Sequence, residues 1–462
     1  MNREYNLSYI VVITLIATLG GLLFGYDTAV ISGAEKSIEA FLIKPLGLSA
    51  LIHGATASSA LIGCIIGGAI SGLLSNRLGR KNTLLVAAFI FFSSSLGAGY
   101  PETFFFTRGE PSMGLLYMFN FYRIFGGIGV GLASAVCPMY IGEIAPAAIR
   151  GRLVSWNQFA IIFGMLVVYF VNWGIAVGQP IEWINTIGWR RMFVSEAIPA
   201  GLFGLLVLII PETPRYLALM HKDDKALGVL TKIMGNKEKA GKILKEIKET
   251  VTETTKSKVF SYGTTVIIVG ILLSVFQQFV GINVAIYYAP RIFESMGAAK
   301  NASMMQTVIM GLVNVIFTVV AIMTVDKWGR KPLLITGSIG MALGMFAISA
   351  LAFNEIIGIS TLVFIIIYTA SFMMSWGPIC WVLISEIFPN KIRGQAVAIA
   401  VAAQWSANYL ISSTYPPMME FSGGMTYGFY GLMSVLSALF VWKMVPETKG
   451  KTLEEMNKLW RK

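Results

Sequence analysis

The stretch SNRLGRK at residues 75–81 returns as VDKWGRK at residues 325–331, and two further motifs repeat behind it in the same order. GEIAPAAIRG at 142–151 returns as SEIFPNKIRG at 385–394, and PETPR at 211–215 is echoed by PETKG at 446–450. Motifs that recur in order at a nearly constant separation indicate an internal duplication. The sequence therefore predicts two similar halves, each carrying all three motifs.

Long apolar runs lie between these motifs. The chain of 462 residues is 55% hydrophobic and 13% charged, with a mean hydropathy of +0.70, which is too apolar for a soluble protein of this size. The runs suit membrane helices of roughly 20 residues, whereas barrel strands would give alternating segments of about 10. We expect an all-α membrane protein with twelve transmembrane helices, near 9–31, 54–75, 83–100, 115–141, 154–177, 192–210, 262–289, 304–325, 333–353, 359–384, 395–418 and 427–445.

The net charge of +12 is explained by its placement and does not indicate nucleic-acid binding. Basic residues cluster after the even-numbered spans, at Arg77, Arg80, Lys81, Arg150, Arg152, Lys327, Arg330, Lys331, Lys391 and Arg393. By the positive-inside rule this side is cytoplasmic, as are both termini. The first span lacks a basic start and a small-residue cleavage site, so we do not interpret it as a signal peptide.

A polar, lysine-rich segment at 212–261 separates the two sets of spans. Its apolar residues recur at helical spacing, which favours short cytoplasmic helices over a solvated linker. The predicted domains are an N-terminal six-helix bundle at 1–211, this helical linker at 212–261, and a C-terminal six-helix bundle with a cytoplasmic tail at 262–462.

The cysteines and histidines give no spacing typical of a metal centre or a disulfide framework. Cys64, Cys137 and Cys380 lie within apolar spans and are interpreted as packing residues, while His53 and His221 lie near predicted loops and are expected to be solvated. The glycines of GGIGVG (126–131) lack a preceding strand, so they favour helix packing over a nucleotide loop. With no nucleophile–base pair found, we expect neither an enzyme nor a cofactor.

Two six-helix halves in parallel repeat, joined by a cytoplasmic loop, are the layout of major facilitator transporters, which bind substrate at the midplane. The motifs GRK, EIAPAAIRG, PETPRYL, QQFVGIN, GPICW and PETKG together resemble the sugar porter branch of that superfamily, over nearly the whole chain. The resemblance implies alternating-access import of a monosaccharide with protons, D-xylose ahead of D-glucose, across a bacterial inner membrane. A proton-independent facilitator and, less favoured, a transporter-like sugar sensor stay as alternatives.

Amides inside the spans match what a sugar requires, since each amide both donates and accepts hydrogen bonds, and a tryptophan adds an apolar face. A single amide could equally serve only to form a hydrogen bond between two helices, worth ~0.6 kcal/mol. By resemblance, six residues correspond to the family's sugar contacts: Gln158, Gln277, Gln278, Asn283, Trp381 and Gln404. Phe24, Tyr287 and Trp405 are candidates for wall or gate aromatics. Met165 stands where the resemblance implies a glutamine in xylose-transporting members, which leaves room for a hexose.

The stretch LLFGYDTAV at 22–30 places Asp27 inside the first span. Acids within a membrane are costly and are functional candidates by default. Arg123 in the fourth span is an available partner, and Glu196 in the sixth span is a second buried acid near Arg123 or the cytoplasmic gate. An inert structural pair is the alternative. By resemblance, proton-coupled members carry Asp at this place and facilitators carry Asn, which favours proton coupling.

The repeated motifs also place charges of both signs at the predicted cytoplasmic ends of the helices. These residues are Arg80, Glu143, Arg150, Arg330, Glu386 and Arg393. The arginines alone could serve only to fix topology. Because topology does not require the two glutamates, we expect a cytoplasmic gate whose charges pair when that side closes.

Overall fold

The computed structural model describes residues 5–103, 105, 107, 109–146, 148–252, 262–295, 297, 299–356, 358–389 and 392–449. All regular elements in these ranges are helices, so the prediction of an all-α fold is confirmed. Several helices begin at a side-chain cap of the kind that satisfies free N–H groups. Asn6, Ser112 and Thr213, for example, accept hydrogen bonds from Tyr9 N, Leu115 N and Tyr216 N.

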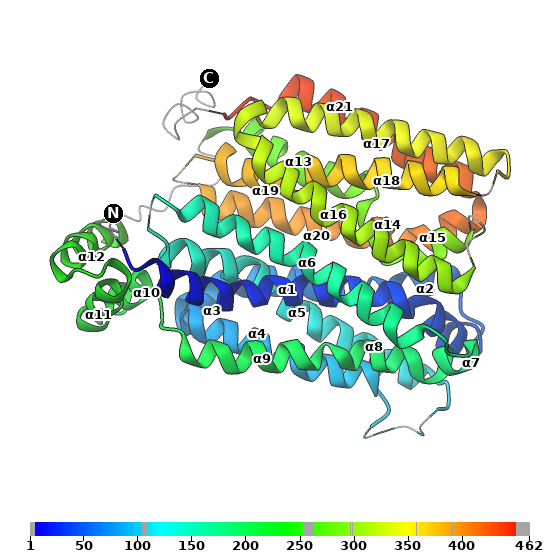
Figure 1. Cartoon of the computed structure of the whole chain (residues 1–462), viewed down its shortest axis with the longest axis horizontal. Coiled ribbons are helices and arrows are strands. Elements are labelled where there is room, and N and C mark those ends of the chain that lie inside the picture. The colour runs from blue at the N-terminus through cyan, green and yellow to red at the C-terminus, as the bar shows by residue number, and fades with distance from the viewer. Residues whose placement is uncertain are drawn as a thin grey trace.

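The helices of the first half occupy the lower layer in Figure 1. They are α1 (Leu7–Ile38) with its π-helical extension η1 (Glu39–Ile43), α2 (Ala50–Ala57), α3 (Ala60–Leu78), α4 (Arg80–Gly99), α5 (Met113–Ile144), α6 (Arg150–Ala176), α7 (Ile181–Trp183), η2 (Ile184–Gly188), α8 (Trp189–Ser195) and α9 (Ala197–Ile209).

The helices of the second half occupy the upper layer of the same view. They are α13 (Thr265–Phe279), α14 (Ile282–Tyr287), α15 (Ala289–Ser295), α16 (Lys300–Trp328), α17 (Arg330–Phe353), α18 (Ile359–Met374), α19 (Trp376–Ile387), α20 (Arg393–Phe421) and α21 (Gly423–Met444).

Three short helices connect the halves, as predicted for the segment 212–261: α10 (Pro214–Leu219), α11 (Asp223–Met234) and α12 (Lys237–Thr252). They lie at the end of the bundle where α1 begins and α21 ends (Figure 1), and Asn6 N donates to Ile233 O of α11 at 2.8 Å. The domain boundaries at 211/212 and 261/262 stay a prediction.

Some predicted spans are broken rather than continuous. The span 262–289 contains α13, α14 and the start of α15, and Gly281 lies at its first break with φ +90°, in the left-handed region that glycine favours. The span 359–384 divides into α18 and α19 at Ser375, and 54–75 divides into α2 and α3. Broken membrane helices leave backbone groups where a protein-lined cavity can use them.

Eleven helical stretches of the described chain are long and apolar enough to cross a membrane. The predicted span 395–418 corresponds to α20, which has 29 residues but is not among the eleven. Its polar side chains lower its hydropathy, and Gln404, Asn408 and Ser412 are all buried in the protein. Polar groups that face the interior of a bundle are typical of functional membrane helices.

Close helix packing brings the two central helices of the first half together. A Cβ added at Gly25 of α1 would lie 1.8 Å from Ile161 O, and one added at Gly164 of α6 would lie 2.1 Å from Leu22 O. Only glycine permits this backbone approach. The contact fixes α1 against α6, and both helices then line the central cavity.

Cys64, Cys137 and Cys380 are buried free thiols, as interpreted from the sequence. His221 is exposed, as expected. The expectation for His53 is wrong, because its side chain is 2% exposed and contacts Glu35. The short helix α2, which the sequence does not separate from the following span, places this histidine against α1.

Candidate functional site

A cavity of about 80 Å³ lies between the two halves. It is lined from the first half by α1 and α6, and from the second half by α13, α14, α18, α19 and α20. The structure brings together all nine residues predicted for the sugar site and its walls: Phe24, Gln158, Gln277, Gln278, Asn283, Tyr287, Trp381, Gln404 and Trp405. Small-molecule pockets usually measure about 300–1,000 Å³, so this cavity is smaller than most.

The amides of the second half form a hydrogen-bonded chain centred on Gln277. Its Oε1 accepts from Gln278 Nε2 at 3.1 Å and from Gln404 Nε2, while its own Nε2 donates to Trp376 O at 3.0 Å. Asn283 Nδ2 extends the chain by donating to Gln278 Oε1. Gln404 Oε1 is buried without a hydrogen-bond partner among the described residues. The amides therefore position one another and keep one acceptor free.

Aromatic residues line the cavity from both halves. The rings of Phe24 in α1 and Trp405 in α20 lie 5.6 Å apart, which is a contact across the two halves. Tyr287 is 3% exposed, and its hydroxyl accepts from Asn408 Nδ2 at 3.3 Å. Trp381 is half-buried and also faces the cavity.

Sequence reasoning missed two polar residues of the cavity wall, Asn408 and Thr28. Asn408 lies one helical turn after Gln404 and so shares its face of α20, which is a signal that spacing could have given. Thr28 follows Asp27 directly, but its hydroxyl donates to Phe24 O at 2.8 Å. Met165, where the resemblance implies a glutamine in xylose-transporting members, lines the same cavity and is 7% exposed.

A buried charge cluster lies beside the cavity in the first half. Arg123 Nη1 of α5 is 2.7 Å from Asp27 Oδ1 of α1, and the two residues are 3% and 1% exposed. Glu196, between α8 and α9, is 1% exposed and interacts electrostatically with both. Asp27 Oδ2, Glu196 Oε1 and Arg123 Nε have no hydrogen-bond partner among the described residues. Unsatisfied buried polar atoms of this kind call for an explanation beyond packing.

This cluster holds two carboxyl groups and one guanidinium. With both acids ionised it carries one uncompensated negative charge in a buried site, and with one acid protonated it is neutral. Burying an unpaired charge is costly, so a single exchangeable proton balances the cluster. The arrangement is therefore chemically able to take up and release one proton.

The repeated motifs build one charge network at the α10–α12 end of the first half. Arg80 Nη2 lies 2.9 Å from Glu143 Oε1, and Thr213 Oγ1 donates to the other oxygen of Glu143 at 2.5 Å. Glu212, from the PET motif, accepts from the backbone N–H groups of Arg80 and Lys81 at the start of α4. Burial raises the pKa of Glu212 above its ordinary value.

The second half repeats this network. Arg330 Nη2 lies 3.1 Å from Glu386 Oε1, and Thr448 Oγ1 donates to Glu386 Oε2 at 2.6 Å. Glu447 accepts from Arg330 N at 3.1 Å and Lys331 N at 2.9 Å. Burial raises the pKa of Glu447, but the backbone N–H donors of Lys449, Lys331 and Arg330 lower it by more, so it lies below its ordinary value.

These pairs form within each half and not across the mouth between the halves. Arg150 is exposed and makes no ion pair with any residue that the structure describes. The side chain of Arg393 lies outside the described residues. The role of all six charged residues as a cytoplasmic gate stays a prediction.

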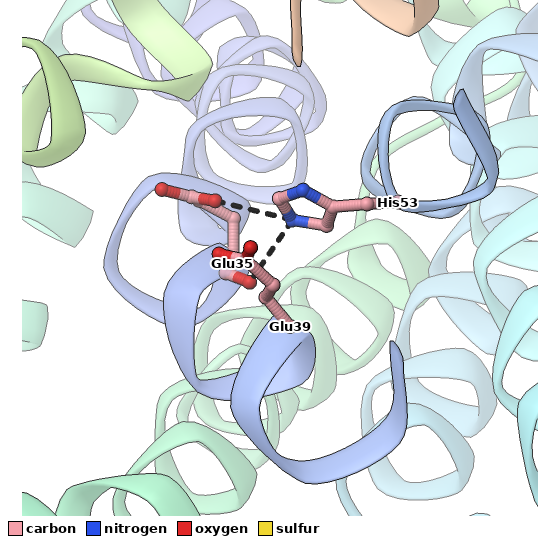
Figure 2. A group of neighbouring side chains, drawn as sticks. All are labelled: Glu35, Glu39 and His53. Carbon is pink, nitrogen blue, oxygen red and sulfur yellow. Dashed lines mark hydrogen bonds and ion pairs between the residues drawn. The ribbon is translucent and has the colours of Figure 1, made fainter. Parts of the chain in front are cut away.

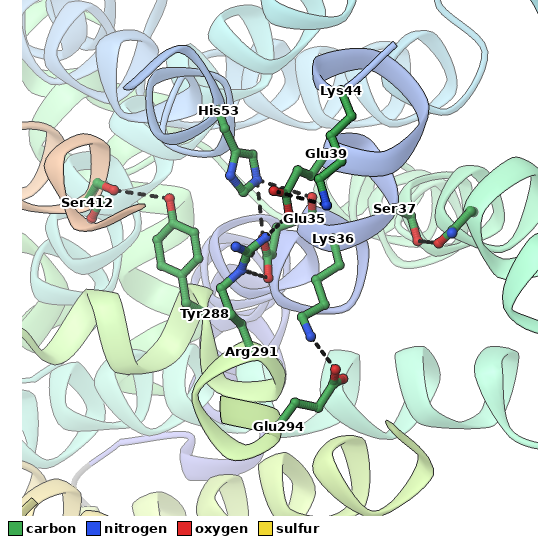
Figure 3. Close-up of polar contacts among 11 residues, drawn as sticks. Glu35, Lys36, Ser37, Glu39, Lys44, His53, Tyr288, Arg291, Glu294 and Ser412 are labelled. Carbon is green, nitrogen blue, oxygen red and sulfur yellow. Dashed lines mark hydrogen bonds and ion pairs between the residues drawn. The ribbon is translucent and has the colours of Figure 1, made fainter. Parts of the chain in front are cut away.

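At the opposite end of the bundle, charged residues pair across the halves (Figure 3). Arg291 of α15 donates from Nε to Glu35 Oε1 at 3.0 Å and from Nη2 to Glu35 Oε2 at 2.9 Å, and it also pairs with Glu39. Lys36 pairs with Glu294 of α15. Burial lowers the pKa of Arg291, but the charges of Glu35 and Glu39 raise it by more, so it stays ionised. No motif in the sequence indicates this cluster.

Comparison with known proteins supplies the family context for this geometry. The profile of the family described as "Sugar (and other) transporter" matches residues 13–460. The "D-xylose-proton symporter" of Escherichia coli K12 is 53% identical over 479 residues, which covers 100% of this chain and 97% of the relative.

Solved structures of that transporter overlap closely with this one. The "inward open conformation of the xylose transporter XylE from E. coli" has a TM-score of 0.89 and 52% identity, and covers 98% of this chain and 100% of its own. The structure of the major facilitator superfamily "proton:xylose symporter XylE bound to 6-bromo-6-deoxy-D-glucose" has a TM-score of 0.84 and 52% identity, with coverage of 99% and 100%.

Proposed function

The chain belongs to the family of sugar (and other) transporters and has the major facilitator fold, and from this we propose that it imports a monosaccharide together with a proton. D-xylose is the first candidate substrate and D-glucose the second. The E. coli relative is described as a D-xylose–proton symporter, and one of its structures holds a D-glucose analogue.

The central observation is the cavity between the halves, lined by amides and aromatic rings. Gln158 from the first half and the chain Gln277–Gln278–Asn283 with Gln404 from the second can bind sugar hydroxyls, and Trp381 offers a face for the ring. Because both halves contribute, a bound sugar connects them. This supports a site to which access alternates between the two sides.

Asp27, Arg123 and Glu196 are proposed as the coupling cluster. Ionised Asp27 pairs with Arg123, and protonation from the outer side weakens that pair and permits the sugar-loaded halves to rock. Glu196 faces the same arginine, so the proton has two carboxyl groups to occupy. We place this step beside the sugar site because α1 carries both Asp27 and the cavity residue Phe24.

The distribution of ion pairs supports an inward-facing state. Pairs that join the halves lie at the end opposite α10–α12, whereas Arg80–Glu143 and Arg330–Glu386 lie at the other end and stay within their halves. The TM-score of 0.89 with an inward-open relative agrees with this assignment. The pairs Arg80–Glu143 and Arg330–Glu386 would then brace each half at its cytoplasmic end, while Glu35, Glu39 and Arg291 close the outer end.

The chain is a membrane protein with many apolar helices. We propose the bacterial inner membrane as its location, with the α10–α12 end and both termini in the cytoplasm. The clustering of basic residues at this end supports that orientation.

The test is transport by the purified full-length chain in liposomes, with D-xylose, D-glucose, L-arabinose and D-ribose compared. Sugar added outside should acidify a weakly buffered lumen, and an inward proton gradient should drive sugar accumulation. Uptake that equilibrates without acidification would replace symport with facilitated diffusion. Binding without any uptake would favour the sensor alternative.

A further inference from the structure

Three metal-ligating side chains meet at the outer end of the first half (Figure 2). Glu35 of α1, Glu39 of η1 and His53 of α2 each offer a ligand atom, and these atoms all lie within 4.8 Å of one another. Glu35 is 0% and His53 2% exposed, so these two ligands are held inside the protein. His53 Nε2 lies 3.2 Å from Glu35 Oε2.

The place of a cation in this cluster is taken by a side chain from the other half. The guanidinium of Arg291 contacts the carboxylates of both Glu35 and Glu39 (Figure 3). The ring of His53 also packs against the second half, with Tyr288 in an edge-on arrangement at 6.4 Å. The three ligands therefore belong to one half, and their bound cation belongs to the other.

We propose that, when the outer end opens, Glu35, Glu39 and His53 bind Zn²⁺ in competition with Arg291. The inference rests on the proposed alternating access, because opening must carry Arg291 away with the second half. The two carboxylates and the imidazole then stay together on the first half, facing the outer solution, and a divalent cation replaces the guanidinium.

The donor set selects the metal. Zn²⁺ takes carboxylate oxygen and imidazole nitrogen at about 2.0–2.2 Å, and three protein ligands with water in a fourth position suit it. Ligand atoms within 4.8 Å need only a small inward movement to meet one ion. Ca²⁺ takes 6–8 oxygen ligands, and Mg²⁺ demands octahedral oxygen geometry, so neither suits this set.

Zinc bound here would hold the outer end open. While the ion is present, Arg291 cannot return to Glu35 and Glu39, and the outer end cannot close. Zinc applied outside should therefore slow sugar uptake by trapping one state, whereas zinc in the lumen of correctly oriented vesicles should not.

The decisive measurement is calorimetric titration of the full-length protein with Zn²⁺ alone, with an affinity tag that contains no histidine. Arg291→Gln removes the competing cation. Lys36→Met, the matched control, breaks the neighbouring cross-half pair with Glu294 but leaves Arg291 and the ligands in place. If the outer end is closed in about nine molecules of ten, apparent affinity in the parent is about tenfold below that of the open site. Arg291→Gln should therefore bind Zn²⁺ about tenfold more tightly than the parent, and adding His53→Ala should abolish this gain in affinity.

Equal zinc affinity in the parent and Arg291→Gln would overturn the inference, as would tight binding that survives His53→Ala. Mg²⁺ at the same concentrations should give no heat that depends on His53. Should Arg291→Gln not fold, inhibition of uptake by external Zn²⁺ decides, because it should be present in the parent and lost in His53→Ala. If the protein moves no sugar, the proposed function fails, and the zinc titration still tests this site.

Discussion

Replacing Asp27 by Asn keeps the size of the side chain but removes its titration, and we expect it to abolish proton-driven accumulation. One proton entering with a neutral sugar moves one charge, worth about 2.3 kcal/mol per 100 mV of membrane potential. That energy corresponds to roughly 50-fold accumulation. The variant should lose this factor and equilibrate at a ratio near one.

The fold should survive this substitution because of Glu196. Removing one partner of a buried ion pair costs about 3–5 kcal/mol when the other charge is left alone. Arg123 would not be left alone, since Glu196 interacts with it and is itself 1% exposed. In Asp27→Asn an ionised Glu196 restores neutrality, so most of that cost should be avoided. The double variant Asp27→Asn with Glu196→Gln should lose the full amount, about 3–5 kcal/mol of folding stability, because Arg123 then has no acid partner in the cluster.

Two assays separate these effects. Accumulation of labelled sugar against its gradient in energised vesicles reports coupling, and thermal unfolding of the purified variants reports stability. Counterflow between preloaded pools should persist in Asp27→Asn, because the amide site is intact. A variant that still concentrates sugar like the parent would refute the reasoning and leave Asp27 a structural acid. Equal stability of the single and double variants would refute the role given to Glu196.

Four further predictions follow from other parts of the structure. Gln278→Ala should weaken sugar binding by about 5- to 150-fold, since an unpaired hydroxyl in a desolvated site costs about 1–3 kcal/mol. The control is Asn172→Ala, which removes an amide that donates to Val30 O away from the cavity. Its sugar affinity, measured by calorimetry, should stay within twofold of the parent's. Met165→Gln should raise the ratio of D-xylose to D-glucose affinity by up to about tenfold, from one added hydrogen bond of about 0.5–1.5 kcal/mol, and an unchanged ratio would contradict this. Arg291→Gln should increase the rate at which maleimide labels a cysteine introduced at Ser413, whose backbone packs against Gly54 of the other half. The native cysteines are buried and should add little background. An unchanged labelling rate would show that the outer end had not opened. The parent should be more stable than Glu447→Gln above pH 4.5, the ordinary pKa of the carboxyl group, and this difference should be lost as pH falls through the lowered pKa of the folded state. A difference in melting temperature that does not depend on pH would argue that Glu447 does not stabilise the start of α17 through its bonds to Arg330 N and Lys331 N.

The sequence was sufficient to predict the fold class, and it indicated which polar residues meet inside the protein. Polar side chains are rare inside apolar spans, so Gln277, Gln278 and Gln404 were conspicuous, and the structure places them in one cavity. The repeated motifs likewise indicated charges of both signs at corresponding positions of the two halves. Their roles stay predictions, and their selection rested on residue type together with the resemblance to the sugar porter branch.

What sequence reasoning missed depends on contacts between distant segments. The burial of His53 requires α1 beside α2 and Tyr288 from the second half, which no local pattern shows. The sequence also did not show that Arg80 pairs with Glu143 and Arg330 with Glu386. Both halves carry the same charges, so each arginine had a possible partner in its own half and another in the opposite half. The break at Gly281 was hidden by the apolar residues on both sides.

The amide chain in the cavity has a consequence for how fast a substrate leaves. Gln277, Gln278, Asn283 and Gln404 already hydrogen-bond one another, so a sugar hydroxyl that binds one of their paired atoms replaces an existing bond, while Gln404 Oε1, which has no partner among the described residues, is free to accept a new one. Exchanging one hydrogen bond for another yields only a small net free energy. Selectivity can then come from the pattern of donors and acceptors, while the bound state stays shallow. A transporter must release its substrate on every cycle. Because the amides can re-form their hydrogen bonds with one another as the sugar leaves, the barrier to release is lower.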